Sequence, residues 1–139
     1  MTNIDALTAA SLWVAAHMLL IWFLGIHVTR LRMKLGVGTG VGDDPKLERA
    51  VRAHGNATEH VPVLLVGLGF MALLGASPMV IHILGATLFV ARLAHAQGIQ
   101  VLDKGLPPGR AGGNIVTWVV TWLIALALIF NFAGLISLF

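Results

Sequence analysis

Long apolar runs separated by short polar segments set the organisation of this chain. Residues 6–29, 61–91 and 111–139 contain no Asp, Glu, Lys or Arg. Because a transmembrane helix needs about 20 mainly apolar residues, the first and last runs each fit one helix. The middle run fits two helices, since the Gly-Ala-Ser-Pro sequence at residues 75–78 breaks it. The pattern predicts an all-α integral membrane four-helix bundle, with one domain over residues 1–139.

Local signals place the helix boundaries. Asp44 followed by Pro45 is a strong start signal, with Asp44 as the N-cap. Gly98 suits the C-terminal cap of the third helix. The second helix would be about 45 Å long at 1.5 Å per residue, so its first turns should project beyond about 30 Å of hydrocarbon. The expected transmembrane helices are, roughly, residues 7–28, 45–74, 78–98 and 112–138.

Composition and charge support this topology. The chain is 58% hydrophobic and 11% charged, whereas a soluble domain is about 25% charged. In a four-span topology all nine Lys and Arg residues lie in or beside the first and third connections, at one membrane face. Basic residues near span ends mark the cytoplasmic side. We therefore expect cytoplasmic basic loops, both termini on the opposite side, lipids as partners and no binding of nucleic acid.

Several kinds of chemistry are disfavoured. There is no cysteine, so any reacting thiol must come from a substrate. None of the six histidines shows the HExxH or HxxxH spacing of a helical metal site, and we expect no metal. The glycine-rich residues 35–44 match neither phosphate-loop pattern and are better interpreted as a flexible linker.

A polar stripe enters the second span. Arg49, Arg52, Asn56 and Glu59 are spaced by three, four and three residues, which places them on one helix face. Glu59 falls at or inside the hydrocarbon boundary, where an ionisable group normally faces protein or a water-filled cavity. Two interpretations remain open at this point. Glu59 either pairs with an arginine and holds helices together, or belongs to a binding site.

Further polar residues occur at the same depth in the third and fourth helices. Each has a structural interpretation: Arg92 can snorkel to the interface, His95 can bond a neighbouring helix, and Arg110 can anchor the helix end. Their convergence at one face suggests a zwitterionic, anionic ligand. Arginines would hold its carboxylates, Glu59 would bind its ammonium group, and Asn56 could donate and accept hydrogen bonds.

These residues resemble the signature of the MAPEG family, the membrane-associated proteins in eicosanoid and glutathione metabolism. The similarity covers nearly the whole chain, and the second-helix motif is its most specific part. The matching residues are Glu48, Arg49, Arg52, Asn56, Glu59 and Pro62 in the second helix, residues 92–98 in the third, and Pro108 and Arg110 at the start of the fourth.

The resemblance implies a homotrimer that binds glutathione between neighbouring subunits at the cytoplasmic face. It assigns Arg110 as the residue that stabilises the glutathione thiolate, with Lys104 as a competitor for that role. Arg30 or Arg32 would come from the adjoining subunit. The residues it assigns to glutathione binding are Arg30, Arg32, Arg49, Arg52, Asn56, Glu59 and His95.

The implied function is that of a membrane-bound glutathione transferase or peroxidase in detoxification. Glutathione would be the co-substrate, and the second substrate a hydrophobic electrophile or lipid hydroperoxide arriving through the bilayer of a bacterial inner membrane. The chain departs from the family in having His60 and Ile99 where relatives often have tyrosines. This departure keeps a second hypothesis open: a non-catalytic membrane protein that binds a lipid or an anionic metabolite, or stabilises a partner.

Overall fold

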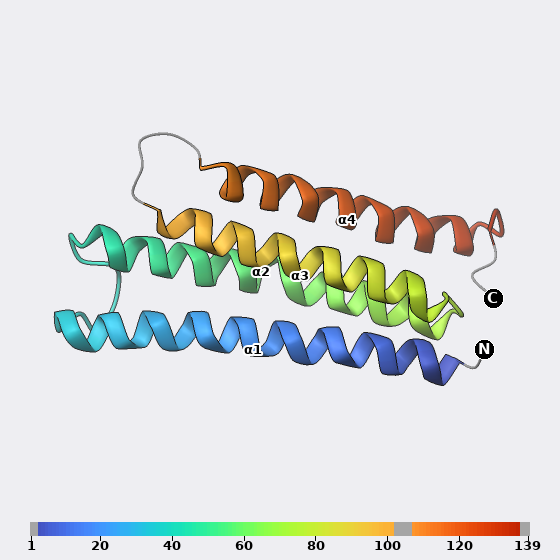
Figure 1. Cartoon of the computed structure of the whole chain (residues 1–139), viewed down its shortest axis with the longest axis horizontal. Helices are drawn as coiled ribbons and strands as arrows, with labels where there is room; N and C mark the ends of the chain where they lie inside the picture. The colour runs from blue at the N-terminus through green and yellow to red at the C-terminus, as the bar shows by residue number, and fades with distance from the viewer. Residues whose placement is uncertain (1–2, 102–106, 137–139) are drawn as a thin grey trace.

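The computed structural model describes residues 3–101 and 107–136, and all regular structure in these ranges is helical. Successive helices run antiparallel, so the α2–α3 turn lies at the same end as the first turn of α1 and the last turn of α4 (Figure 1). All four are long and apolar enough to cross a membrane, which confirms the predicted fold. The helices are α1 (Asn3–Leu35), α2 (Pro45–Leu73), α3 (Pro78–Gln100) and α4 (Pro108–Phe132).

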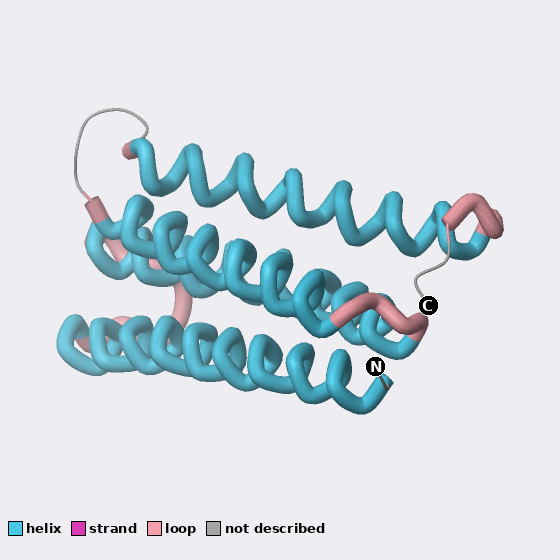
Figure 2. The backbone as a smooth tube through the Cα atoms, turned by 45° about the vertical axis from the view of Figure 1, so that its right-hand side comes forward, coloured by secondary structure: helices cyan, strands magenta, loops and turns pink. Residues whose placement is uncertain are grey.

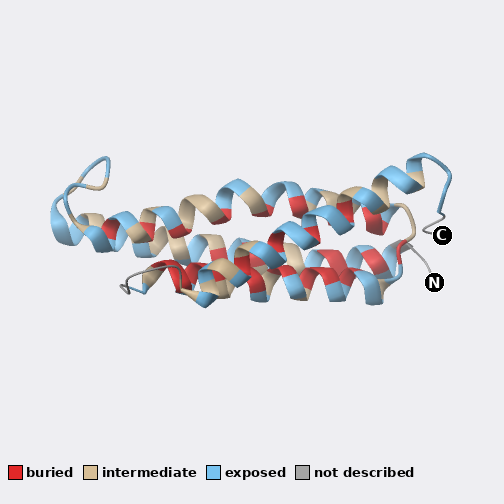
Figure 3. Ribbon diagram, turned by 90° about the horizontal axis from the view of Figure 1, so that it is seen from above, coloured by how far each residue is buried: buried red, intermediate tan, exposed pale blue. Residues whose placement is uncertain are grey.

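The two central helices, α2 and α3, hold the bundle together. Both pack against α1 and α4, whereas α1 and α4 make no contact with each other over the described residues (Figures 1 and 2). Buried residues follow the inward faces of the helices, and the outer surfaces are exposed (Figure 3). Many of these exposed side chains are large and apolar, such as Trp22, Phe23 and Trp122. Such surfaces suit contact with lipid or with another subunit.

The predicted start of α2 is confirmed. The Asp44 side chain accepts hydrogen bonds from the backbone N–H groups of Lys46 at 2.8 Å and Leu47 at 2.9 Å. Pro45 occupies the first turn, where its missing N–H costs nothing. The helix has 29 residues, about 44 Å at 1.5 Å per residue, so it exceeds the hydrocarbon thickness as expected.

The first helix is longer than predicted. It continues past residue 28 to Leu35 and therefore contains Arg30 and Arg32. The end of an apolar run marks the end of the span, but charged residues such as arginine and lysine are good helix formers. The helix ends only before Gly36, whose φ of 67° lies in the left-handed region that favours glycine.

The boundaries around the third connection also differ from those predicted. The third helix continues to Gln100, so Gly98 is not its cap, and the fourth helix begins at Pro108 rather than at residue 112. Pro108 is tolerated in the first turn because its backbone needs no hydrogen there. The fourth helix ends at Phe132, earlier than predicted, and residues 137 and 138 of the predicted helix lie outside the described residues.

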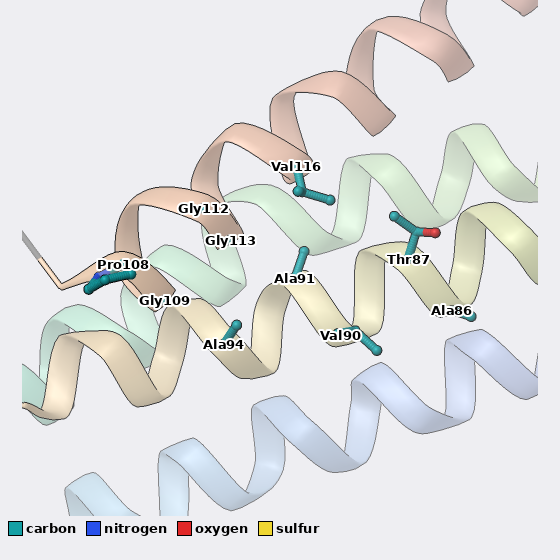
Figure 4. A pocket seen from close by; sticks show the side chains of 10 residues that line it. All are labelled: Ala86, Thr87, Val90, Ala91, Ala94, Pro108, Gly109, Gly112, Gly113 and Val116. Carbon is teal, nitrogen blue, oxygen red and sulfur yellow. The ribbon is translucent and has the colours of Figure 1, made fainter.

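Glycines bring the backbones of α3 and α4 into direct contact. A Cβ at Gly98 would lie 2.9 Å from Arg110 Cα, and one at Gly113 would lie 2.8 Å from the His95 backbone nitrogen. Figure 4 shows the glycine-bearing face of α4 turned toward α3. Small residues at such contacts are typical of membrane helices, because association there depends on close packing rather than on burial from water. Gly98 therefore serves packing instead of capping.

We expect Gly113→Ala to destabilise the protein by about 1–3 kcal/mol, because the added methyl meets backbone atoms that cannot rotate away. Gly112→Ala is the matched control, since its Cβ would have no neighbour within 4 Å. The control should be neutral or stabilising because alanine favours a helix. Unfolding of the detergent-solubilised protein, followed by tryptophan fluorescence, measures both. Equal unfolding midpoints would contradict the packing role of Gly113.

Candidate functional site

A pocket of about 360 Å³ lies between α2, α3 and α4, at the end of the bundle where α3 leads into α4. We call it the polar pocket. The side chains come from segments far apart in the sequence, which the antiparallel fold brings to one level. Its polar lining residues are Arg52, Asn56, His95, Arg110 and Asn114, and its apolar ones are Ile99, Ala111, Ile115 and Trp118.

Arg92 is a buried arginine that contacts Asn56, one of the residues lining the pocket. Arg92 is 2% exposed, and its Nη1 donates a hydrogen bond of 2.8 Å to Asn56 Oδ1. Its Nε and Nη2 are buried without a hydrogen-bond partner. The structural interpretation of Arg92 as a side chain that snorkels to the interface is wrong, because the side chain turns into the bundle. A buried guanidinium is costly unless it is well bonded, so the Asn56 contact is a structural link between α2 and α3.

His95 lines the pocket from α3 and connects this helix to the start of α4. It is 6% exposed, and its Nδ1 lies 2.8 Å from the backbone oxygen of Arg110. A carbonyl only accepts, so Nδ1 carries the proton and donates. This is the interhelical hydrogen bond that the structural interpretation of His95 described. The bond also fixes the first turn of α4, and with it the backbone from which the Arg110 side chain projects.

Four of the predicted site residues share the polar pocket: Arg52, Asn56, His95 and Arg110. The guanidinium-bearing Arg52 and Arg110 are both exposed residues, and Asn56 is half-buried. Among residues 3–101 and 107–136, no carboxylate lines the pocket. The arrangement therefore offers positive charge and N–H donors to an anionic ligand.

The other predicted site residues lie outside this pocket. Arg49 is half-buried with its Nε atom unpartnered, and Glu59 is exposed on α2. Arg30 and Arg32 are on α1, which contributes nothing to the pocket, and Arg32 Nη1 donates to the Gly38 oxygen at 3.5 Å. Lys104 lies outside the described residues. Within one chain, the structure thus brings together four of the predicted site residues and leaves the others outside the polar pocket.

Sequence reasoning did not identify Trp118 as a pocket residue. Arg110, Asn114 and Trp118 follow one another at intervals of four residues, so they lie along one face of α4. This four-residue spacing could have identified Trp118 from the sequence. The Asn114 Oδ1 atom is buried without a hydrogen-bond partner, which leaves an acceptor beside the pocket. Residues 3–101 and 107–136 contain no group of three His, Cys, Asp or Glu residues that could hold a metal ion.

Comparison with known proteins identifies the family. The MAPEG family model matches residues 10–130, which include every residue that lines the polar pocket. The chain belongs to the MAPEG family. The membership confirms the resemblance carried by the α2 motif, and it agrees with the four apolar spans of an integral membrane protein.

This MAPEG protein also has bacterial relatives. It is 35% identical over 118 residues to the inner membrane protein YecN of Escherichia coli K12. The match covers 85% of this chain and 88% of YecN, and the same values hold for YecN of the O6:H1 strain CFT073. A bacterial-type member is therefore confirmed.

We expect His95→Ala to destabilise this MAPEG protein by about 1–2 kcal/mol, because the hydrogen bond to the Arg110 carbonyl is lost. His27→Ala is the matched control, since His27 is exposed on α1. Chemical unfolding in detergent measures both variants. The link between α3 and α4 would be refuted if the two variants unfolded at the same denaturant concentration.

Proposed function

We propose that this MAPEG protein is a membrane-bound glutathione transferase or peroxidase that binds glutathione in the polar pocket. The supporting observation is the convergence of Arg52, Asn56, His95 and Arg110, from three helices, on one pocket. Glutathione is a tripeptide with two carboxylates, and guanidinium groups bind carboxylates through paired, charge-assisted hydrogen bonds. The family membership supports the same ligand class.

In this proposal Arg110 stabilises the glutathione thiolate. A thiol with a pKa near 8.5 is mostly protonated at neutral pH, and the thiolate is the nucleophile. Lowering that pKa by two units requires about 2.7 kcal/mol, within reach of a guanidinium contact in a poorly hydrated pocket. The His95 bond to the Arg110 backbone supports the required placement.

The thiolate then attacks an apolar substrate supplied by the bilayer. In a transferase reaction, sulfur forms a bond to the electrophilic carbon, and the leaving group departs with its electron pair. In a peroxidase reaction, two glutathione molecules become the disulfide while a lipid hydroperoxide becomes an alcohol and water. Both reactions begin with the same anion, so the pocket residues do not discriminate between them.

A neighbouring copy would complete the site. Glu59 is exposed on a membrane helix, at a depth where a carboxylate facing lipid is unfavourable. We propose that the face carrying Arg49 and Glu59 packs against another subunit of a homotrimer. Arg30 or Arg32 of that subunit would then reach glutathione, because α1 does not reach the pocket of its own chain.

We place the protein in a bacterial inner membrane, as the name of the relative YecN supports. The last turns of α1 and α3 and the first turns of α2 and α4 lie at the end of the bundle opposite the α2–α3 turn (Figure 1). Basic residues at that end favour a cytoplasmic orientation. The polar pocket would then open toward cytoplasmic glutathione, with both termini on the other side.

One observation favours a second, non-catalytic function. An apolar groove of about 500 Å³ runs between α3 and α4, lined mainly by alanine, glycine and valine (Figure 4). It contains no residue of α2 and none of the residues of the polar pocket. A lipid chain would fit its chemistry. Glutathione binding without turnover on any electrophile would favour such a lipid-binding role.

We expect Arg110→Ala to leave about 25-fold less thiolate at pH 7, which corresponds to a two-unit rise in the thiol pKa. Turnover of an activated aryl halide and the ultraviolet absorbance of the bound thiolate should fall together. Lys34→Ala removes the same charge from the exposed end of α1 and is the control. Unchanged absorbance and turnover in Arg110→Ala would remove this role from Arg110.

Calorimetric titration with glutathione tests the binding residues. Arg52→Ala should weaken binding at least tenfold, because a charge-assisted hydrogen bond contributes about 1.5–3 kcal/mol. Glu59→Gln should weaken it as well if Glu59 binds the ammonium group across the subunit boundary. Binding that persists unchanged in both variants would refute the proposed site.

A further inference from the structure

The orientation of Asn56 is fixed by its partner. An asparagine amide accepts hydrogen bonds through oxygen and donates them through nitrogen, whereas a guanidinium only donates. The Asn56 atom 2.8 Å from Arg92 Nη1 must therefore be Oδ1, even though amide oxygen and nitrogen are hard to tell apart by shape. With Oδ1 engaged in the bundle interior, Nδ2 is left to face the polar pocket that Asn56 lines.

The guanidinium that sets this orientation is itself confined. Phe89, one turn before Arg92, makes an edge-on ring contact with His17 at a centroid distance of 5.3 Å. His17 is completely buried, as is nearly all of Arg92. Both side chains are therefore enclosed in the interior of the bundle rather than at its surface.

His17 also offers chemistry that complements Arg92. Its Nδ1 donates to the Trp13 oxygen at 2.7 Å, so in the neutral ring Nε2 is an acceptor. That Nε2 is buried without a partner, as are the donors Nε and Nη2 of Arg92. His17 contacts Phe89, one turn before Arg92 on α3, so these unpartnered groups lie in the same part of the bundle interior. None of the three atoms bonds directly to another protein group, but a bound water could accept from Arg92 and donate to His17.

We propose that Arg92 is a positioning residue that holds Asn56 as an obligate hydrogen-bond donor to the polar pocket. In this proposal His17 stabilises the guanidinium from the side of α1. The sequence alone allowed Asn56 both to donate and to accept. The ligand group that meets Asn56 is therefore an acceptor, a carboxylate or a peptide carbonyl, and not an ammonium or an amide N–H. Only the choice of glutathione as this ligand rests on the proposed function.

A double-mutant cycle on the full-length protein in detergent tests this role. Calorimetry with glutathione is compared for the wild type, Arg92→Met, Asn56→Ala and the double variant. Introduced into the wild type, Arg92→Met should weaken glutathione binding about tenfold, or 1.4 kcal/mol. Introduced into the Asn56→Ala variant, it should not weaken binding any further. Losses that multiply would overturn the proposal, because they would show that Arg92 acts independently of Asn56.

Asn56→Asp tests the polarity of the contact. The new carboxylate keeps the shape of the side chain and pairs with Arg92, but it presents acceptors to the pocket instead of an NH2 group. We expect glutathione affinity to fall at least tenfold. Affinity equal to or greater than that of the wild type would overturn the assignment of Asn56 as a donor.

A ligand-free measurement separates this proposal from the proposed function. If the wild type binds no glutathione, the proposed function fails, and unfolding midpoints decide the positioning role. The double variant with Arg92→Met and Asn56→Ala should then have the same unfolding midpoint as the less stable of the two single variants. His17→Leu should have a lower unfolding midpoint than His17→Gln, because glutamine keeps a hydrogen-bond acceptor. Additive shifts, or equal midpoints for the two His17 variants, would refute the network.

Discussion

The backbone contact between α3 and α4 is the constraint on which the polar pocket depends. Gly98 and Gly113 allow the two helices to approach until their main chains touch. At that distance His95 reaches the Arg110 carbonyl, and the first turn of α4 is fixed relative to α3. A wider separation would leave the same residues at the same level of the membrane without a shared pocket.

Polar groups inside the bundle add specificity at an energetic cost. Membrane helices gain little from the hydrophobic effect on association. The energetic cost of burying an arginine must therefore be offset by the contacts that its side chain makes. Arg92 is joined to Asn56 by a direct hydrogen bond, and both lie beside the pocket that carries the proposed chemistry. The same interaction thus links helix packing to the donor pattern presented to a ligand.

Much of the fold could be predicted from the sequence, since apolar runs and the Asp44-Pro45 cap report on single helices. The convergence of Arg52, Asn56, His95 and Arg110 also followed from counting depth along each helix. The inward turn of Arg92 and the packing role of Gly98 did not follow. Both depend on which neighbouring helix covers a given face, and helical periodicity contains no such information.

The most direct test of the account is an experimental structure of the protein in a lipid nanodisc at saturating glutathione. The expected result is glutathione in the polar pocket, with an acceptor group within hydrogen-bond distance of Asn56 Nδ2 and its sulfur beside the Arg110 guanidinium. Glutathione ordered at another place, or a polar pocket without glutathione at saturation, would contradict the central claim.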